Sequence, residues 1–368
     1  MKARFLNKDY EIKIWDGQQL GKNVAVDTET TFVPFTQTPD LITFQAFDGS
    51  RVFYVRLGDI RKFLGQHAES ILIFHNAAFD IDVICKHLSK NMMYDHARNY
   101  FDEWINKGTI YDTAILYRLL GLATNGFVPH KYNLALVTNE LFGVELDKNE
   151  EIRTTFEQFK GQDPVHIPEH YLRYGALDVI ATFYVFNSLL SAASATGSTT
   201  QLSHQIQLAG AIALNRMYKR GIGFDVERAT EVLNRLYSEM AVHQDILATY
   251  GWVRGFKGSK ERYEWIVRDY LQLDLPRTED GSVSSKSEDL EKYKDNHFVK
   301  SYLKFIELEK QSTFLRDLNN ELIHPRYNYL LNTGRTSCSN PNFQQLPRDG
   351  EIRGCFTATS GNTFLITD

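Results

Sequence analysis

The sequence has few cysteines, no long apolar run and no excess of basic residues, and each of these absences excludes a class of protein. Three cysteines in 368 residues, without a CxxC or Cys/His spacing, exclude a disulfide framework and a cysteine-bound zinc site. Apolar runs end well short of the roughly 18 residues that cross a bilayer, and the N-terminal segment lacks the apolar centre of a secretory signal. We therefore expect a protein of the reducing cytoplasm that has no membrane partner.

Bulk charge does not identify a partner either. The chain has 41 Lys and Arg against 46 Asp and Glu, a formal net charge of −5, whereas nucleic-acid-binding proteins usually carry a basic excess. Apolar residues make up 43% of the chain and charged residues 24%, which predicts packed cores rather than disorder. The length predicts two or three domains.

Strand-like and helix-like patterns alternate over residues 1–192. Apolar runs at 41–47 and 51–55 flank Asp48-Gly49, a pair typical of hairpin turns. Further strands are expected near 24–26 and 70–74, and helices at 77–88, 112–120 and 168–190. Alternation of this kind predicts an α/β fold in which helices cover a mixed sheet.

A change of composition follows this region. Residues 188–200 are small and polar without a helical or strand period, so we place a linker at 193–204. Amphipathic patterns then predict a mainly helical region over 205–325. From 326 to 368 the helical period gives way to short strands joined by turns.

An acidic pair, Asp27 and Glu29, ends the first of the expected strands. Carboxylates two residues apart on a strand point to the same face, which suits divalent cations that take oxygen ligands. The pair alone is weak evidence, because the sequence holds five Asp-x-Glu pairs. Two later features distinguish this copy: Asp80 lies in the first turn of a helix, and Tyr174 and Asp178 lie one turn apart on another.

Each later feature also has a plainer explanation when it is taken alone. Asp80 is equally explained as a first-turn acid that the helix dipole favours, and Tyr174 as a half-buried aromatic residue. The ordered set is what indicates a catalytic site, because five specified residue types must coincide.

The sequence resembles the DEDD superfamily of 3′–5′ exonucleases in three motifs that follow in the same order. They are D-x-E after a strand, N-x-x-F-D after a later strand and Y-x-x-x-D on a helix. The tyrosine places the resemblance in one subgroup. It implies an RNase H-like exonuclease domain over 1–192 that hydrolyses phosphodiesters with two divalent metal ions, Mg²⁺ or Mn²⁺. Asp27, Glu29 and Asp178 would hold one metal, Asp27 and Asp80 the other, and Tyr174 would orient the attacking water.

Neighbouring residues of these motifs also have expected roles. Asn76 and Phe79 are expected to shape the substrate cleft. Asp112-Thr113 matches the family as well, and its position at a helix start is also explained as an N-cap. His75 is expected to pack at a strand end rather than to bind a metal.

The second half of the chain carries a resemblance of its own. Residues 333–347, TGRTSCSNPNFQQLP, are similar to the TGRxSSxxPNxQNxP motif of family A (DNA polymerase I-like) DNA polymerases, with Cys338 and Gln345 as departures. The resemblance implies that Arg335, Asn342 and Gln344 contact the primer–template minor groove. That groove presents similar acceptors in every base pair, so it can be bound without sequence preference.

The same family implies what surrounds this motif. Arg353 lies in a stretch that resembles the next family segment and is expected to contact DNA, while 205–325 corresponds to a thumb and 326–368 to the start of the polymerase palm. Asp368 would be the first metal-binding aspartate of an incomplete polymerase site, and one carboxylate cannot make a two-metal site. We therefore expect DNA synthesis to need a second polypeptide, as in a split phage polymerase acting in the host cytoplasm; a truncated product is the alternative.

Three functions remain open at this point. The first is the N-terminal part of a family A DNA polymerase, with a proofreading exonuclease for single-stranded 3′ ends and a thumb that binds primer–template duplex. The second is a stand-alone 3′–5′ exonuclease on DNA or RNA, because the fold alone does not choose the sugar. The third is a catalytically silent nucleic-acid-binding subunit, which would bind duplex in a salt-sensitive way without hydrolysis.

Overall fold

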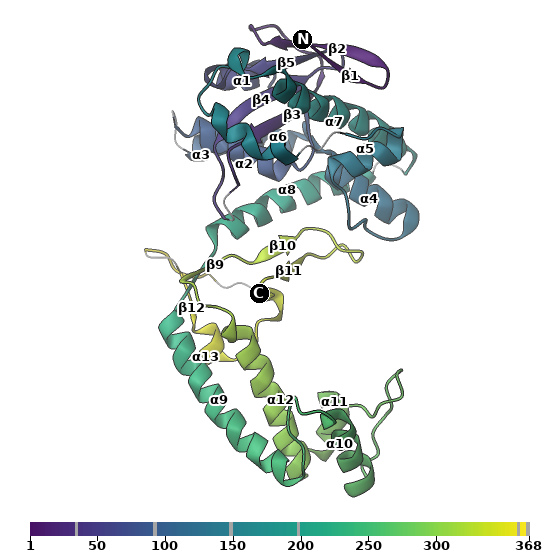
Figure 1. Ribbon diagram of the computed structural model, residues 1–368, viewed down its shortest axis with the longest axis vertical. Coiled ribbons are helices and arrows are strands. Elements are labelled where there is room, and N and C mark those ends of the chain that lie inside the picture. The colour runs from purple at the N-terminus through teal and green to yellow at the C-terminus, as the bar shows by residue number, and fades with distance from the viewer. Residues whose placement is uncertain (34–35, 91–93, 147–149, 197–198, 359–360, 366–368) are drawn as a thin grey trace. The chain divides into compact units, whose positions relative to one another are not determined.

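The computed structural model describes residues 1–368 except 34–35, 91–93, 147–149, 197–198, 359–360 and 366–368 (Figure 1). The chain forms two compact units. The first unit is Met1–Arg220 with Arg326–Ser339, and the second unit is Gly221–Pro325 with Asn340–Asp368. Asp368, the predicted ligand of the polymerase site, lies outside the described residues.

A seven-stranded mixed sheet forms the centre of the first unit, in the order β1-β2-β5-β4-β3-β6-β7. The strands are β1 (Lys2–Phe5), β2 (Lys8–Ile14), β3 (Asn23–Thr30), β4 (Leu41–Phe47), β5 (Arg51–Val55), β6 (Ile71–Phe74) and β7 (Ile110–Asp112). β4 and β5 pair antiparallel around the expected turn at Asp48-Gly49, whereas β6 is parallel to both β3 and β7. The predicted α/β fold with a mixed sheet is confirmed.

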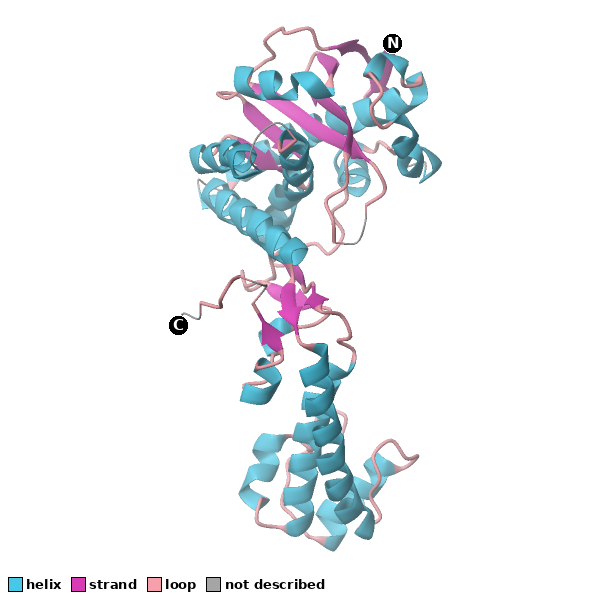
Figure 2. Ribbon diagram, turned by 90° about the vertical axis from the view of Figure 1, so that its left-hand side faces the viewer, coloured by secondary structure: helices cyan, strands magenta, loops and turns pink. Residues whose placement is uncertain are grey.

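Helices cover both faces of this sheet (Figure 2). They are α1 (Ile60–Gln66), α2 (Ala77–Leu88), α3 (Tyr94–Lys107), α4 (Thr113–Asn125), α5 (Leu134–Phe142), α6 (Glu150–Thr155), α7 (Glu169–Ala195) and α8 (Thr199–Arg220). Because successive side chains of a strand point to opposite faces, Val24 and Val26 of β3 join one buried apolar cluster and Ala25 joins the other.

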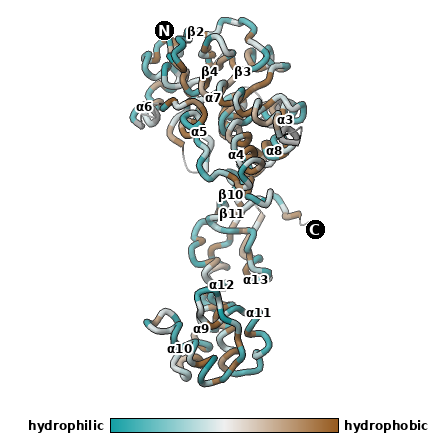
Figure 3. The backbone as a smooth tube through the Cα atoms, turned by 90° about the vertical axis from the view of Figure 1, so that its right-hand side faces the viewer, coloured by the Kyte–Doolittle hydropathy of each residue, from teal (hydrophilic) through white to brown (hydrophobic). Residues whose placement is uncertain are grey.

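The central helix of the unit is α7. By length and composition alone it is apolar enough to cross a membrane. Its apolar side chains, such as Ala176, Val179 and Ile180, are instead buried against the sheet, and Figure 3 shows hydrophobic stretches of the chain beside it. Burial within the protein therefore accounts for its composition.

The linker expected at 193–204 is a prediction that the structure corrects. The described residues there belong to the end of α7 and the start of α8. α8 buries Leu208, Ala211 and Ile212 in the apolar cluster of the first unit, so the change of unit comes after Arg220. Composition misled the prediction because a segment rich in alanine, although it lacks an apolar period, is a good helix former.

The second unit is mainly helical. Its helices are α9 (Val226–Thr249), α10 (Ser259–Trp265), α11 (Ser287–Leu290), α12 (His297–Arg316) and α13 (Gly350–Arg353), and its three-stranded sheet is β12 (Phe356–Thr357), β8 (Ile222–Phe224) and β9 (Leu322–Ile323). α9 and α12 pack along each other, with Leu236 and Leu308 among the buried side chains. Most of the mainly helical region that the sequence predicts over 205–325 lies in this unit, whereas its first part, 205–220, belongs to α8 of the first unit.

The segment 326–368, expected to be one palm fragment, is divided between the units. β10 (Arg326–Asn328) and β11 (Ser337–Ser339) form an antiparallel hairpin that belongs to the first unit, where Leu330 is buried in the apolar cluster. Beyond Ser339 the chain belongs to the second unit, where Ile352 is buried. The polymerase-like motif therefore starts in one unit and ends in the other.

Candidate active site

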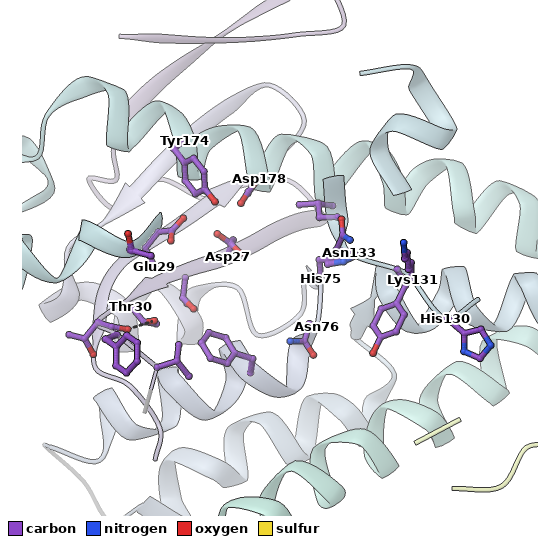
Figure 4. Close-up of a pocket in the computed structure, with 18 residues that line it drawn as sticks. Asp27, Glu29, Thr30, His75, Asn76, His130, Lys131, Asn133, Tyr174 and Asp178 are labelled. Carbon is purple, nitrogen blue, oxygen red and sulfur yellow. Dashed lines mark hydrogen bonds between the residues drawn. The ribbon is translucent and has the colours of Figure 1, made fainter. Parts of the chain in front are cut away.

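Three of the predicted carboxylates come together where β3 passes under α7. Asp27 and Glu29 are two residues apart on β3, and Asp178 lies on α7. One oxygen of each carboxylate lies within 4.8 Å of the others. Tyr174, one turn before Asp178 on α7, lies beside them in Figure 4. The structure thus brings together four of the five residues that the exonuclease motifs single out.

The position of Asp27 depends on a buried amide that the sequence prediction missed. Gln45 on β4 is fully buried and donates a hydrogen bond of 2.7 Å from Nε2 to Oδ2 of Asp27. Its own Oε1 accepts a bond of 3.0 Å from the Thr43 hydroxyl. Because both ends of the amide are bonded, it fixes the orientation of the carboxylate. The available signal was an amide side chain in the 41–47 strand, whose other residues are apolar except for Thr43.

Gly175 lets α7 lie close to this amide. A Cβ atom at Gly175 would be 2.8 Å from Nε2 of Gln45 and 2.8 Å from the hydroxyl of Tyr54, which is shorter than any ordinary contact. Tyr54 is itself buried and donates to the carbonyl of Leu172 at 2.6 Å. Glycine is therefore required between Tyr174 and Asp178 for the helix to reach the strands.

Asp80, the fifth predicted residue, is not part of the carboxylate cluster in the described residues. It is buried, 3% exposed, in the first turn of α2, and its Oδ1 accepts a bond of 2.6 Å from the hydroxyl of Thr28. Burial is the main cause that raises the pKa of Asp80 to about 7. The side chain of Thr28 points away from those of Asp27 and Glu29, since residues alternate along a strand, and this bond draws Asp80 toward that side.

Asp112 connects the starts of two helices. Its carboxylate accepts bonds from the backbone N–H groups of Asn76 (3.1 Å), Ala77 (2.8 Å) and Ala114 (2.8 Å). The N-cap expected at the start of α4 is confirmed, and the second helix start was not predicted. Asp112 is 3% exposed, and burial raises the pKa of its carboxyl group.

A pocket of about 1040 Å³ opens beside the carboxylates. Its lining includes the expected Asn76 and Phe79, and also His75, whose Nδ1 lies 2.8 Å from the hydroxyl of Thr113. Two further parts of the wall were not predicted from the sequence: Phe32 and Val33 after β3, and His130–Leu134 before and at the start of α5. Phe32 is 74% exposed, and the signal for it was an apolar pair that follows the acidic motif after two threonines.

The residues expected to bind duplex DNA are divided between the units. Arg335 is exposed in the turn of the β10–β11 hairpin in the first unit. Asn342, Gln344 and Arg353 belong to the second unit, where the Asn342 side chain accepts from the backbone N–H of Gln344 at 3.2 Å. Arg353 donates to the carbonyl of Pro347 at 3.0 Å.

Comparison with known proteins identifies the domain that contains these residues. A family model described as 3′–5′ exonuclease, from the family A DNA polymerases, matches residues 8–193. DNA polymerase I of Aquifex aeolicus (strain VF5) is 24% identical over 341 residues, which cover 87% of this chain and 56% of that polymerase. The DNA polymerase of Escherichia phage T5 is 24% identical over 337 residues, which cover 84% of this chain and 38% of the phage enzyme.

A solved structure shows the same fold. The POL domain of Pol1 from M. smegmatis, in complex with DNA primer-template and dNTP, has a TM-score of 0.62 and 14% identity, and the match covers 94% of this chain and 57% of that one. This chain thus spans about half of the length of the relatives that it matches. Because the exonuclease model covers half of the chain, and because the motifs and relatives agree with it, the chain belongs to the family A DNA polymerases and carries their 3′–5′ exonuclease domain.

Proposed function

We propose that the first unit is a proofreading exonuclease that removes nucleotides from the 3′ end of a single DNA strand with two divalent ions. The supporting observation is the cluster of Asp27, Glu29 and Asp178, with Tyr174 beside it at one end of a pocket. A pocket of this kind with converging carboxylates is the default location of a hydrolytic site.

The donor atoms of the cluster fit the ions that the family uses. All are carboxylate oxygens, which suit Mg²⁺ or Mn²⁺ better than softer metals. Asp27, Glu29 and Asp178 would hold one ion, and Asp27 would share the second with Asp80, whose carboxylate would then exchange Thr28 for the metal. Such ions activate a water and neutralise charge on the phosphate.

The residues of the chain contribute orientation. Gln45 donates to one oxygen of Asp27 and so fixes the orientation of this carboxylate beside the pocket. Tyr174 would position the attacking water through its hydroxyl, because a hydroxyl group can both donate and accept a hydrogen bond. Asn76 and Phe79 would hold the terminal nucleotide in the pocket.

We further propose that Arg335, Asn342, Gln344 and Arg353 bind primer–template duplex. The two related polymerases are longer than this chain, which covers 56% and 38% of their lengths. DNA synthesis in the relatives is therefore an activity of longer chains. The second polypeptide with the rest of the palm and fingers remains a prediction. It would be tested by adding that part of a related polymerase and measuring primer extension. The cytoplasmic location is likewise a prediction.

The exonuclease is tested with 5′-labelled single-stranded DNA and Mg²⁺ or Mn²⁺. We expect stepwise shortening from the 3′ end that is lost in Asp27→Ala/Glu29→Ala. Asp9→Ala/Glu11→Ala is the matched control, since this pair has the same spacing but is exposed on β2, and it should keep full activity.

Other outcomes would favour the other two functions. Hydrolysis confined to RNA of the same sequence would favour a stand-alone ribonuclease. Salt-sensitive binding of duplex without any hydrolysis would favour a silent subunit and would refute the proposal.

A further inference from the structure

One wall of the pocket is a loop that is attached to the polymerase-like hairpin. We define the wall loop as residues 126–133, between α4 and α5. Its last residues, His130 to Asn133, line the pocket, and Lys131 is the lysine among the lining residues. Figure 4 shows Lys131 and His130 at the end of the pocket away from the carboxylates. An exposed lysine there suits the phosphates of a strand whose 3′ end is at the carboxylates.

The wall loop folds back closely onto α4. Gly126 ends the helix in the left-handed conformation, with a φ of 76°. A Cβ atom at Gly121 would lie 2.5 Å from Cδ of Pro129, so the loop rests directly on the helix backbone. Val128 is 4% exposed and belongs to the same apolar cluster as Leu330 of the hairpin.

Hydrogen bonds join the wall loop to the β10–β11 hairpin. The backbone N–H of Val128 donates to Oδ1 of Asn332 at 2.7 Å. Asn332 lies in the hairpin turn, which is closed by bonds from Leu331 N to Arg335 O (2.9 Å) and from Gly334 N to Leu331 O (2.8 Å). The loop is therefore bonded to the turn that presents Arg335.

Arg118 on α4 joins the same two segments. Its side chain is 3% exposed, and Nη2 donates to the carbonyl of Leu330 at 2.8 Å and to Oδ1 of Asn328 at 3.0 Å. The guanidinium Cζ lies 4.7 Å from the ring centre of Tyr132, in the wall loop, and 4.5 Å from that of Tyr329, in the hairpin. These four partners are all neutral, and a planar guanidinium can stack on two rings in a way that a lysine ammonium cannot.

We propose that Arg118 and Asn332 are positioning residues of the exonuclease: they fix the wall loop to the β10–β11 hairpin and thereby place Lys131 for the phosphates of the single strand. The inference rests on the proposed exonuclease function and adds to it. It means that the hairpin carrying the start of the polymerase motif is also a structural support of the exonuclease pocket. Neither residue touches the reacting phosphate, so both act on substrate binding rather than on the chemical step.

The test compares two substrates. A single-stranded oligonucleotide has phosphates that can reach Lys131, whereas an aryl ester of thymidine 5′-phosphate has one nucleotide and no further phosphate. We expect Arg118→Lys and Asn332→Ala to raise KM for the oligonucleotide roughly two- to tenfold, the effect of losing about one hydrogen bond, with kcat unchanged. Hydrolysis of the ester should be unchanged. Asn187→Ala, another exposed asparagine of the first unit, is the matched control and should keep the original KM.

A double-mutant cycle separates positioning from general structure. If Arg118 and Asn332 act through Lys131, either variant should add nothing to the KM increase of Lys131→Ala. Three results would overturn the inference: additive effects on KM, an oligonucleotide KM that neither variant changes, or a loss of ester hydrolysis in Asn332→Ala. Asn332 is exposed, so its variant remains informative if Arg118→Lys fails to fold. Failure of the unaltered chain to hydrolyse the ester would instead refute the proposed function.

Discussion

Gly175→Ala tests whether the close approach of α7 to β4 is what positions the carboxylates of Asp27 and Asp178. The new Cβ would be 2.8 Å from both Gln45 Nε2 and the Tyr54 hydroxyl. An ordinary contact begins near 3.4 Å, so each of the two partners would have to move by about 0.6 Å. Neither partner is the free end of an exposed side chain, because Gln45 is bonded to Asp27 and Tyr54 to the backbone at Leu172.

Two opposing effects determine the stability of this variant. Alanine in place of glycine inside a helix stabilises by about 1 kcal/mol. Overpacking of a buried site costs about 1–3 kcal/mol. The second effect is the larger, so we expect Gly175→Ala to be destabilised by up to about 2 kcal/mol rather than stabilised.

Activity should fall further than stability. Displacing the Gln45 amide removes the bond that orients Asp27, and loss of a group that orients a metal ligand typically costs about 10- to 100-fold in metal affinity or activity. We expect a loss of that size in 3′–5′ hydrolysis at limiting Mg²⁺, with partial recovery when Mg²⁺ is raised. The measurement is the rate of single-strand shortening as a function of Mg²⁺ concentration, together with thermal unfolding of the same samples.

Gly210→Ala is the matched control. Gly210 also lies inside a helix of the first unit, α8, and a Cβ there meets nothing within 4 Å. This variant should gain about 1 kcal/mol from helix propensity and keep its activity. If Gly175→Ala behaves like Gly210→Ala, gaining stability and hydrolysing DNA at the original rate, the role assigned to the Gln45 contact is wrong.

Three further variants test other residues of the site. The pKa of Asp80 is raised to about 7, so its protonated form stabilises the fold at low pH, and that contribution is lost as pH rises from about 4 to 7. Without divalent ions, the melting temperature of Asp80→Asn should therefore fall less between pH 5 and 8 than that of the unaltered chain. Equal slopes of melting temperature against pH would contradict the assignment. Tyr174→Phe keeps the buried ring but removes the hydroxyl that would orient the attacking water, so it should lower kcat about 100-fold, the cost of misplacing a reacting group; a normal kcat would exclude the hydroxyl from the reaction. Asp112→Ala removes the acceptor shared by two helix starts. It should lower the free energy of unfolding in urea by about 2–4 kcal/mol, since one lost cap costs about 1 to 2 kcal/mol. A change under 1 kcal/mol (about one weak cap) would show that water replaces the carboxylate as acceptor.

The sequence predicted those parts of the fold and site that depend on local pattern. Residues 41–47 and 51–55 form β4 and β5, and residues 77–88 form α2, as expected, because a short apolar run, a turn pair and a 3.6-residue period are local signals. The proximity of Asp27 and Glu29 to Asp178 also follows from the motifs. The order of the motifs identifies the fold, and this fold places the strand that carries the first motif under the helix that carries the last.

What the sequence could not predict depends on contacts between distant residues. The bond of Asp80 to Thr28 joins two elements that are 52 positions apart, and no pattern distinguishes an acid that faces a hydroxyl from one that faces a metal. Gln45 was missed because a single amide in an apolar strand has no periodic signal. The wall loop was missed because it has no helical or strand period. Its packing on Gly121 and its hydrogen bond to Asn332, 204 positions further along the chain, are what hold it in place.

The misplaced linker has a consequence for the site itself. The expected boundary separates His204 of α8 from the exonuclease domain. His204 is fully buried and stacks on Tyr111, with 5.0 Å between the ring centres. Its Nε2 accepts a hydrogen bond of 2.9 Å from the backbone N–H of Asp112. Burial lowers the pKa of His204 to about 4, so the ring is neutral near pH 7 and Nε2 stays an acceptor. Asp112 in turn accepts the N–H of Asn76 at the pocket. Because this series of bonds runs from α8 to the pocket wall, α8 is part of the exonuclease unit, and the unit that forms the active site continues beyond residue 192 to Arg220.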